Sequence, residues 1–468
     1  MTEKEGNQPK KFKYSNKIHI SYGLGGFLDN FFIAAFTVRV FDYYQNELLL
    51  ATALVGIAFV IFGVWNAIND PILGVLSDRK FRFTKKWGRR FPWFTIGALS
   101  YTFIYFLIIV APFRDQFGMF IWLIITICAF ELLFSLWQIN WLSLFPDKFR
   151  EPKERTRVGA WTTIWGVIGI ALGVLIPPLI IEYANVTTHI LAAIVVTFIG
   201  FIMVLFALPG MREDEDVIAR QLKVLERQKE KDSFIDITKT VVKDKNFMAY
   251  VLTYLGHQVL TVMMLASLPY WNKYILGSPD PDLETIMSAG FLVAVLASVP
   301  FWAYIGKKYG NKKAYMMGTL LTTFLFMPFF FINDLIGTTI AVALIGFGIG
   351  AIWVLMYPGF SDVIDDIVVK TGKREEGSYT GIRTFFGRLS IVIQAVSFAL
   401  IHLATGYRPG AEIGATSQTP LAQFGIRFLM AGIPMIFYFI GFLLMWRVYK
   451  LDKVAVDANV KLLQEKVL

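Results

Sequence analysis

The chain alternates between long apolar segments and short polar ones. A membrane-spanning helix needs about 20 apolar residues, and segments of that length occupy twelve windows. The windows are 18–43, 52–78, 92–112, 118–146, 158–182, 188–209, 246–275, 285–306, 313–333, 336–364, 378–404 and 421–448. The pattern therefore predicts twelve transmembrane helices.

A charged segment separates the first six windows from the last six. It begins MREDEDVIARQLKVLERQKEKD and continues as the amphipathic FIDITKTVV, a pattern typical of a segment that lies in water or on a membrane surface. Residues 1–17 lack the apolar core of a cleavable signal peptide, so we expect the first span to target the chain to the membrane. The expected divisions are a tail at 1–17, a six-helix bundle at 18–210, a linker at 211–244, a second six-helix bundle at 245–450 and a tail at 451–468.

Composition and charge agree with a multi-pass membrane protein. The chain is 56% hydrophobic and only 17% charged, which excludes an ordinary soluble protein. Its net charge of +10 does not favour a nucleic-acid partner, because Lys and Arg gather in short loops between the spans, such as RKFRFTKKWGRR and KFREPKERTR. The opposite loops hold almost no Lys or Arg, so the positive-inside rule predicts that both termini and the linker lie in the cytoplasm. We expect a multi-pass protein of the plasma membrane.

The two halves of the chain resemble each other. PDKFREPKERTRVGAW in the first half resembles IDDIVVKTGKREEGSYTG in the second, and SDRKFRFTKKWGRR is echoed by IGKKYGNKKAY six helices later. Two parallel six-helix halves with a site between them are the layout of the major facilitator superfamily. The predicted fold is therefore an all-α membrane protein of that superfamily, with twelve transmembrane helices in two pseudo-symmetric six-helix bundles.

The second window carries polar residues at membrane depth. Asn66, Asn69 and Asp70 lie in the run from Asn66 to Pro71, which would favour a turn in water. Because apolar residues continue on both sides, we expect an unbroken helix whose polar face looks into the protein. An ionisable residue inside the membrane indicates a functional site, so Asp70 is the first candidate for a proton or coupling-ion site.

Two longer segments resemble the glycoside–pentoside–hexuronide:cation symporters, the family of melibiose permease. They are NAINDPILGVLSDR with the following WGRRFPW, and SDVIDDIVVKTGKREEGSYTGIRTF. The opening YGLGGFLD fits the same family. The resemblance implies a monomeric symporter that carries a sugar or glycoside with a monovalent cation by alternating access. The vertebrate lysophosphatidylcholine transporters share the general pattern, which leaves a lysophospholipid or another amphiphilic or anionic substrate as the alternative.

The resemblance also implies a cation site on the second and fourth helices, made by two acids, an Asn and a hydroxyl. The matching positions are Asn66, Asn69, Asp70 and Ser135, so an amide replaces the first acid. Losing the negative charge of that acid should weaken sodium binding, whereas proton binding needs only one buried carboxylate. We therefore expect the coupling ion to be H⁺ in preference to Na⁺. Glu131 lies one turn before Ser135; it either returns the missing carboxylate or forms a buried structural pair.

For the substrate, the resemblance implies an acid on the first helix, a second acid on the fourth and an aromatic platform. Asp29 matches the first acid, and Gln138 stands where the second would be, which favours a sugar other than a galactoside. Polar side chains bind sugar hydroxyls and aromatic faces cover the C–H side of the ring, although each Trp could instead serve packing or the interface. The expected substrate-binding residues are Asp29, Gln138, Asn140, Trp141, Trp353 and Arg388.

Two arginines in the spans have alternative interpretations. Arg388 matches a cavity-facing lysine of the family, and it either balances Asp29 or Asp70 or binds a carboxylate, sulfonate or phosphate. Arg39 lies near the outer end of the first span with Asp42 one turn later, close enough to pair. It is either a snorkelling arginine at the interface or a contact for an anionic substrate.

Charges at the cytoplasmic ends of the two halves predict a gate that closes the inner side. The positive-inside rule explains some of the lysines there but not the acids. The expected gate residues are Asp78, Arg79, Asp147, Arg155 and Arg157 in the first half, and Asp362, Asp365, Asp366, Arg374, Glu375 and Arg383 in the second.

Several other functions lack a supporting motif. The four histidines have no metal-binding spacing, and the single cysteine, Cys128, excludes a disulfide within the chain. No Walker loop or nucleophile elbow occurs. We therefore expect no metal, no cofactor other than the coupling ion and no enzymatic activity; a non-transporting receptor on the same fold is the remaining rival to a transporter.

Overall fold

A computed structural model describes residues 13–78, 81–149, 152–219, 221, 241–372, 376–410 and 418–466. Within those ranges it leaves out some side chains on helices, including those of Asp70 and Asp78. Every regular element in the described ranges is helical.

The first half contains seven helices, of which α3 is a short surface turn. They are α1 (Asn16–Asp42) with its π-helical continuation η1 (Tyr43–Glu47), α2 (Thr52–Asp78), α3 (Thr84–Trp87), α4 (Phe91–Ile109), α5 (Gln116–Lys148), α6 (Pro152–Leu175) and α7 (Val186–Met211).

The second half has six spanning segments and a terminal helix. They are α10 (Lys245–Tyr274), α11 (Asp282–Tyr309), α12 (Asn311–Leu325) with η2 (Met327–Phe330), α13 (Leu335–Thr371), α14 (Glu376–Thr405), the continuous run of α15 (Pro420–Arg427), η3 (Phe428–Gly432) and α16 (Ile433–Arg447), and finally α17 (Lys453–Lys466).

The twelve predicted windows correspond one to one to these spanning segments. In the described part of the chain, ten helices are long and apolar enough to cross a membrane by themselves. The other two spans are α2, whose described apolar part is Thr52–Asn66, and the 15-residue α12. The helix α2 runs unbroken through Asn66–Pro71, so the prediction of a helix there is confirmed.

The sixth helix, α6, ends earlier than the window 158–182 predicts. It stops at Leu175, and turns follow through Pro177 and Pro178. Proline lacks a backbone N–H and disfavours helical geometry in the residue before it. Two consecutive prolines therefore end the helix although the apolar sequence continues.

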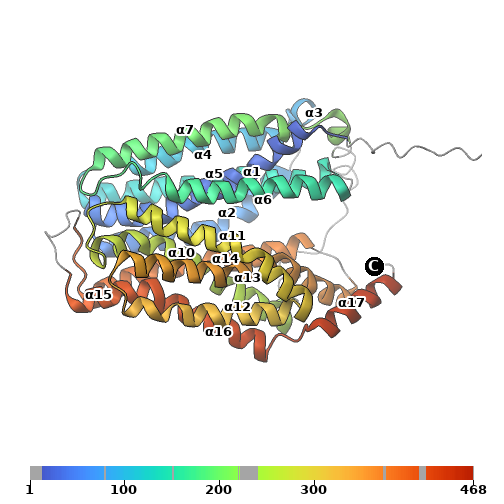
Figure 1. Ribbon diagram of the computed structural model, residues 1–468. Coiled ribbons are helices and arrows are strands. Elements are labelled where there is room, and N and C mark those ends of the chain that lie inside the picture. Colours follow the sequence, from blue (N-terminus) through green and yellow to red (C-terminus); the bar gives the residue numbers. More distant parts are fainter. Residues whose placement is uncertain are drawn as a thin grey trace, which may run out of the picture.

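The two halves form two helical bundles that lie side by side (Figure 1). In the first bundle α1 packs on α6 and α7, and in the second α11 packs on α13. Glycines allow the backbones of α1 and α6 to approach, since a Cβ at Gly169 would lie 2.6 Å from the Phe27 carbonyl oxygen. Such small residues are typical of close helix contacts in membranes.

The bundles meet mainly through α2 with α14, α1 with α10 and α6 with α11. Small residues also bring α2 against α14. A Cβ at Gly56 would lie 2.7 Å from Ala399 Cβ, and one at Gly63 would overlap Val392 Cγ2. Side chains of α14 therefore pack directly against the backbone of α2 at these two glycines.

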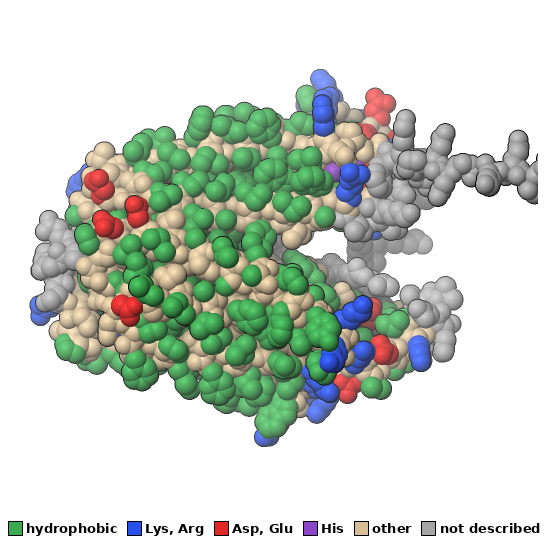
Figure 2. Space-filling view, in the orientation of Figure 1, with side chains coloured by type: hydrophobic (Ala, Val, Ile, Leu, Met, Phe, Trp, Pro, Cys, Tyr) green, Lys and Arg blue, Asp and Glu red, His purple; other side chains and the backbone are tan. Residues whose placement is uncertain are grey.

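The two ends of the molecule differ in charge and in shape. Lys and Arg side chains gather at the end that carries α3, the start of α1 and α17, which we call the basic end; the opposite end is the far end (Figures 1 and 2). Hydrophobic side chains cover the flank between the two ends, and the surface is hollowed between the halves at the basic end (Figure 2). The protein is therefore open towards the basic end.

Candidate functional site

Arg388 lies on α14 and reaches across to the first half. Its Nη1 donates hydrogen bonds to Asn66 Oδ1 at 2.6 Å and to Glu131 Oε1 at 3.1 Å. Its Nη2 donates to Gln138 Oε1 at 3.2 Å. One guanidinium from the second half therefore binds an amide on α2 together with a carboxylate and an amide on α5.

Two further contacts complete this group. Gln138 Nε2 donates to Asp29 Oδ1 on α1, and Ser135 Oγ donates to Glu131 Oε1 at 3.3 Å while lying 3.5 Å from Arg388 Nη1. We call the group the central cluster. Its members are Asp29, Asn66, Glu131, Ser135, Gln138 and Arg388.

Helical spacing explains how α5 contributes three members. Glu131, Ser135 and Gln138 lie four and three residues apart, so they share one face of the helix. Glu131 and Asn66 both bind Arg388 Nη1, so this carboxylate stands beside the amide at the position where the resemblance implies an acid. The structure thus brings Glu131 to the expected cation site, where it also forms an ion pair.

Asn69 lies on α2 three residues after Asn66 and is only 1% exposed. Neither its Oδ1 nor its Nδ2 has a hydrogen-bond partner among the described residues. A buried polar group without a partner costs about 1–3 kcal/mol, so a bound ion or water is the natural partner here. The Asp70 side chain lies outside the described residues.

The formal charges of the described members of the central cluster do not balance. Arg388 is paired directly with Glu131 and is linked to Asp29 through Gln138. One guanidinium thus faces two carboxylates in a region of low dielectric constant, where uncompensated charge is costly. Uptake of one proton or one monovalent cation would neutralise the group.

The remaining predicted substrate residues lie apart from this cluster. Asn140 Nδ2 donates to the Leu136 carbonyl, and its Oδ1 accepts from Arg90 Nη1. Trp141 is buried against α1, with its Nε1 donating to the Tyr22 carbonyl at 3.2 Å. Trp353 packs, partly buried, on the core of the second half. In this state all three lie in packing positions.

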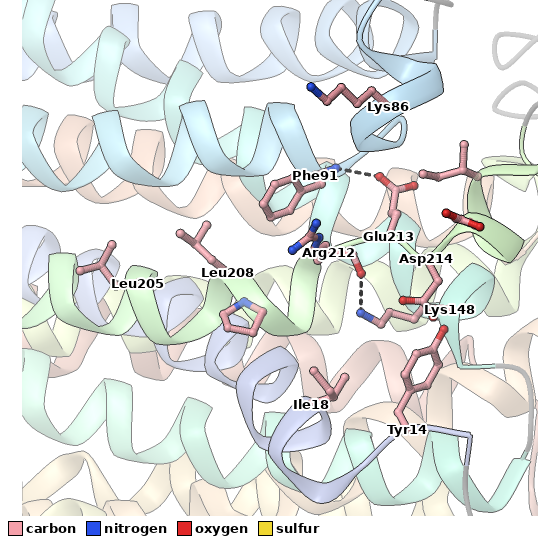
Figure 3. A pocket seen from close by; sticks show the side chains of 13 residues that line it. Tyr14, Ile18, Lys86, Phe91, Lys148, Leu205, Leu208, Arg212, Glu213 and Asp214 are labelled. Atoms are coloured by element: carbon pink, nitrogen blue, oxygen red, sulfur yellow. Dashed lines mark hydrogen bonds between the residues drawn. The ribbon is translucent and has the colours of Figure 1, made fainter.

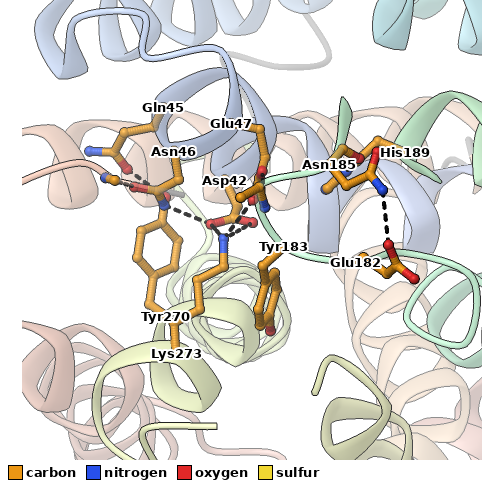
Figure 4. A network of polar contacts seen from close by, with 12 residues as sticks. Asp42, Gln45, Asn46, Glu47, Glu182, Tyr183, Asn185, His189, Tyr270 and Lys273 are labelled. Carbon is orange, nitrogen blue, oxygen red and sulfur yellow. Dashed lines mark hydrogen bonds and ion pairs between the residues drawn. The ribbon is translucent and has the colours of Figure 1, made fainter. Parts of the chain in front are cut away.

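Buried ion pairs between the halves close the far end (Figure 4). Arg39 Nη2 lies 2.6 Å from Glu284 Oε2, and both side chains are almost fully buried. Lys273 Nζ lies 3.0 Å from Glu47 Oε1 and 3.3 Å from Asp42 Oδ2. The expected pairing of Arg39 with Asp42 is therefore not formed, because each has a partner on the other half instead.

Polar contacts extend this closure across the interface. The Tyr183 hydroxyl donates to Glu284 and accepts from Asn272 Nδ2, and Tyr270 on α10 donates to Gln45 on η1. We call the group the far-end seal. Its members are Arg39, Asp42, Gln45, Asn46, Glu47, Tyr183, Tyr270, Asn272, Lys273, Glu284, His402 and Tyr407.

Sequence reasoning missed the second-half members of the far-end seal. Lys273 lies inside the apolar window 246–275, and a charged residue within a span is a signal that could have found it. Glu284 falls one residue before the window 285–306. No local pattern indicates that Arg39 would pair with a residue 245 positions away.

Several described gate candidates at the basic end contact residues of their own half, and Asp147 contacts the linker. Arg155 Nε donates to the Phe149 carbonyl at 2.6 Å, and Asp362 accepts from Asn311 at 2.8 Å. Asp147 accepts from Gln221, Asp366 accepts from Asn246 and Lys370, and Arg383 lies against aromatic rings of α10 and α13. Arg157 and Asp365 are partly buried on α6 and α13.

Four gate candidates lie outside the described part of the structure. They are Arg79, Arg374 and Glu375, together with the side chain of Asp78. Because the surface is hollowed between the halves at this end (Figure 2), a cytoplasmic gate stays a prediction for the state in which the basic end is closed.

A separate surface cavity of about 900 Å³ lies at the basic end of the first half (Figure 3). Glu213 Oε2 accepts from the backbone N–H groups of Arg90 at 2.7 Å and Phe91 at 2.9 Å, which begin α4. Burial raises the pKa of the Glu213 carboxyl, although these N–H groups oppose the shift. Lys148 Nζ donates to the Gly210 and Arg212 carbonyls, so the cavity wall fastens the end of α7 to α4 and α5.

The fold and the polar group between its halves define a secondary transporter of the major facilitator superfamily. Solved structures agree: the chain aligns with the D-xylose–proton symporter with a TM-score of 0.65 at 14% identity, covering 93% of this chain and 98% of that one. For the nucleoside transporter NupG the TM-score is 0.60 at 16% identity, covering 92% and 99%. The predicted fold is confirmed.

A family model described as MFS/sugar transport protein matches residues 21–453, so the chain belongs to that family. One relative is the glucuronide carrier protein homolog of Escherichia coli, 23% identical over 91% of each chain. Others are a putative sulfoquinovose importer of Salmonella typhimurium, 23% identical over 89% of this chain and 87% of that one, and the sodium-dependent lysophosphatidylcholine symporter 1-B of Danio rerio, 23% identical over 91% and 85%. The predicted membership of a glycoside–pentoside–hexuronide-like family is confirmed.

Proposed function

We propose that this protein carries a sugar or glycoside together with one monovalent cation, a proton in preference to sodium, across the plasma membrane by alternating access. The observation that carries the proposal is the position of Arg388, whose guanidinium binds Asn66 and Glu131. The family resemblance expects the coupling cation at this place. A positive side chain from one half therefore occupies a cation site on the other.

Coupling follows from competition for the same oxygen atoms. A proton or ion that binds at Glu131 or Asp70 weakens the attraction of Glu131 for Arg388, whose Nη1 lies 3.1 Å from Glu131 Oε1. Release of Arg388 also frees Gln138, which otherwise binds both Arg388 and Asp29. Polar groups become available to sugar hydroxyls only after the cation has bound, so the two ligands support each other's binding.

The direction of opening follows from the charge of the two ends. If the basic end is cytoplasmic, as the positive-inside rule predicts, the described state is open inward and the far-end seal is the extracellular closure. The sugar would leave through the hollow at the basic end (Figure 2). Breaking the far-end seal would then be part of the return to the outward-open state.

An acidic sugar is a second candidate for the cargo. Two relatives are named for a glucuronide and for sulfoquinovose, and a carboxylate or sulfonate could bind both nitrogen donors of Arg388 in place of Glu131 and Gln138. A third relative is named for lysophosphatidylcholine, a cargo that would need an apolar pocket for its chain. The transport assay therefore includes all three classes.

The test is uptake into proteoliposomes that contain the purified full chain. Labelled glucose, glucuronate and lysophosphatidylcholine are supplied separately under an inward proton gradient or an inward sodium gradient. We expect a proton gradient to drive uphill uptake of a sugar. Accumulation of lysophosphatidylcholine alone would replace the sugar by a lipid cargo, and no accumulation of any probe would favour a receptor.

Two variants locate the coupling site. We expect Asp70→Asn and Glu131→Gln to abolish uphill uptake, because each removes a carboxylate that takes the cation, while exchange of labelled for unlabelled sugar continues. The matched control is Glu182→Gln, which changes an exposed carboxylate at the far end. Uphill uptake that survives both site substitutions would show that coupling lies elsewhere.

A further inference from the structure

A second buried arginine, Arg383, lies on α14 five residues before Arg388. At 1.5 Å of rise per residue it is roughly 7.5 Å nearer the basic end. Its side chain is packed among aromatic rings, since the guanidinium carbon lies 4.5 Å from the ring centre of Phe360, 5.0 Å from that of Tyr254 and 5.7 Å from that of Tyr357. We call these three rings the aromatic cage.

Unlike Arg39 and Arg388, Arg383 has no acidic partner among the residues that the structure describes. Arg39 is paired with Glu284 and Arg388 with Glu131. Arg383 has no ion pair with any described residue, is 8% exposed, and keeps its Nε and Nη1 without hydrogen-bond partners. The guanidinium stays charged at any physiological pH, and aromatic faces compensate a buried charge only in part. Two buried donors of Arg383 therefore lack a partner among the described residues.

The aromatic cage lies next to the central cluster. Tyr254 separates the two, because its ring faces Arg383 and a Cβ at Gly387, the residue before Arg388, would lie 2.6 Å from Tyr254 Cε1. Tyr357 is 65% exposed whereas Arg383 is almost covered, so the cage is open on the Tyr357 side. It thus stands between the central cluster and the basic end, where the protein is open.

We propose that Arg383 and the aromatic cage form a second anion-binding site, which receives the carboxylate or sulfonate of an acidic sugar as it moves between the central cluster and the basic end. The planar guanidinium offers paired donors that match such oxygens, and the rings cover the C–H face of the sugar. A neutral sugar gains only the stacking. The nature of the cargo rests on the proposed function, but the anion site does not.

The first test measures binding without transport. Glucuronate and glucose are titrated calorimetrically into the purified full chain and into Arg383→Gln, Arg383→Lys and Arg388→Gln, with the exposed Arg212→Gln as a matched control. We expect Arg383→Gln to bind one glucuronate fewer than the wild type, Arg383→Lys to bind it at least tenfold more weakly, and Arg388→Gln and Arg212→Gln to retain this site. Glucuronate binding that is unchanged in Arg383→Gln, or absent from the wild type, would overturn the proposal.

The second test separates an anion site from a gate. If Arg383 only pairs with an acid of the first half when the basic end closes, Arg383→Gln changes glucose and glucuronate transport equally, which would also overturn the proposal. An anion site predicts at least a tenfold higher KM for glucuronate on the cytoplasmic face, with glucose transport unchanged. A wild type that binds glucuronate at Arg383 yet transports nothing would reject the proposed function and keep the anion site.

Discussion

Removing one charge of the far-end seal should open the far end of the protein. In the state described, Arg39 and Glu284 have only 2% and 1% of their side-chain surface exposed and lie 2.6 Å apart. Breaking such a buried pair by removing one partner costs about 3–5 kcal/mol. When the far end opens, the same groups are in water, where an ion pair contributes only about 0–1 kcal/mol.

The difference between these two costs sets the expected shift. Glu284→Gln should move the balance towards the state open at the far end by roughly 2–5 kcal/mol, which corresponds to about 30- to 5,000-fold in the equilibrium constant. Two such states usually differ by a few kcal/mol. The substitution is therefore large enough to reverse which state is preferred.

Spin labels on the two halves can measure the change. Thr187 lies in the first turn of α7 and Asp282 begins α11, and both are exposed at the far end. Replacing Cys128, the single cysteine, by Ser leaves two introduced cysteines as the labelled sites. Pulsed electron–electron distance measurements should give one short distance in the parent chain and a longer one in Glu284→Gln.

Two controls separate opening from damage. Glu182→Gln alters an exposed carboxylate whose amide partner, Asn185, lies in the same half, so it should leave the distance unchanged. The double change Arg39→Met with Glu284→Met removes both charges and should restore the short distance, because apolar pairs often replace buried ion pairs at little cost. An unaltered distance in a folded Glu284→Gln protein would refute the assignment of this pair to the closure.

Three further outcomes are expected. Gly63→Ala should lower the free energy of unfolding by about 1–3 kcal/mol, because the new methyl overlaps Val392. Adding Val392→Ala to that variant should recover most of the lost free energy in an unfolding assay. Asn69→Leu should keep stability within about 1 kcal/mol, since it removes a buried amide that has no partner among the described residues, yet abolish the cation dependence of uptake. The free energy of unfolding should fall as the pH rises from the ordinary pKa of a Glu carboxyl through the raised pKa of Glu213. In that range the folded state holds a proton that the unfolded state has lost. Glu213→Gln should make the free energy of unfolding depend less on pH.

The sequence was a good guide wherever the physical cause is local. Apolar length predicts the spans, and polar residues flanked by apolar ones in α2 predict an unbroken helix. The spacing of Glu131, Ser135 and Gln138 places them on one helix face, and the family resemblance places Arg388 near them; the structure brings all four together.

Contacts between distant segments could not be predicted in the same way. Arg39 has an acid three residues away in sequence, but its partner is Glu284 on the other half. The choice depends on how the two bundles lean against each other, which no local pattern encodes. Trp141 shows the same limit, because an aromatic residue at membrane depth can line a cavity or fill a gap, and here its ring packs against Tyr22 and Gly25 of α1.

The contact between α2 and α14 bears on how the protein can be handled in the laboratory. Val392 sits in the recess left by a residue without a side chain, at a line where the two bundles touch. A side chain packed into such a recess allows the two bundles to rotate relative to each other about this contact, but it opposes translation of α2 along α14. A larger residue at position 63 would push α2 and α14 apart at this contact. A series of residues of increasing size at position 63 therefore offers a way to hold the two bundles at chosen angles to each other for imaging.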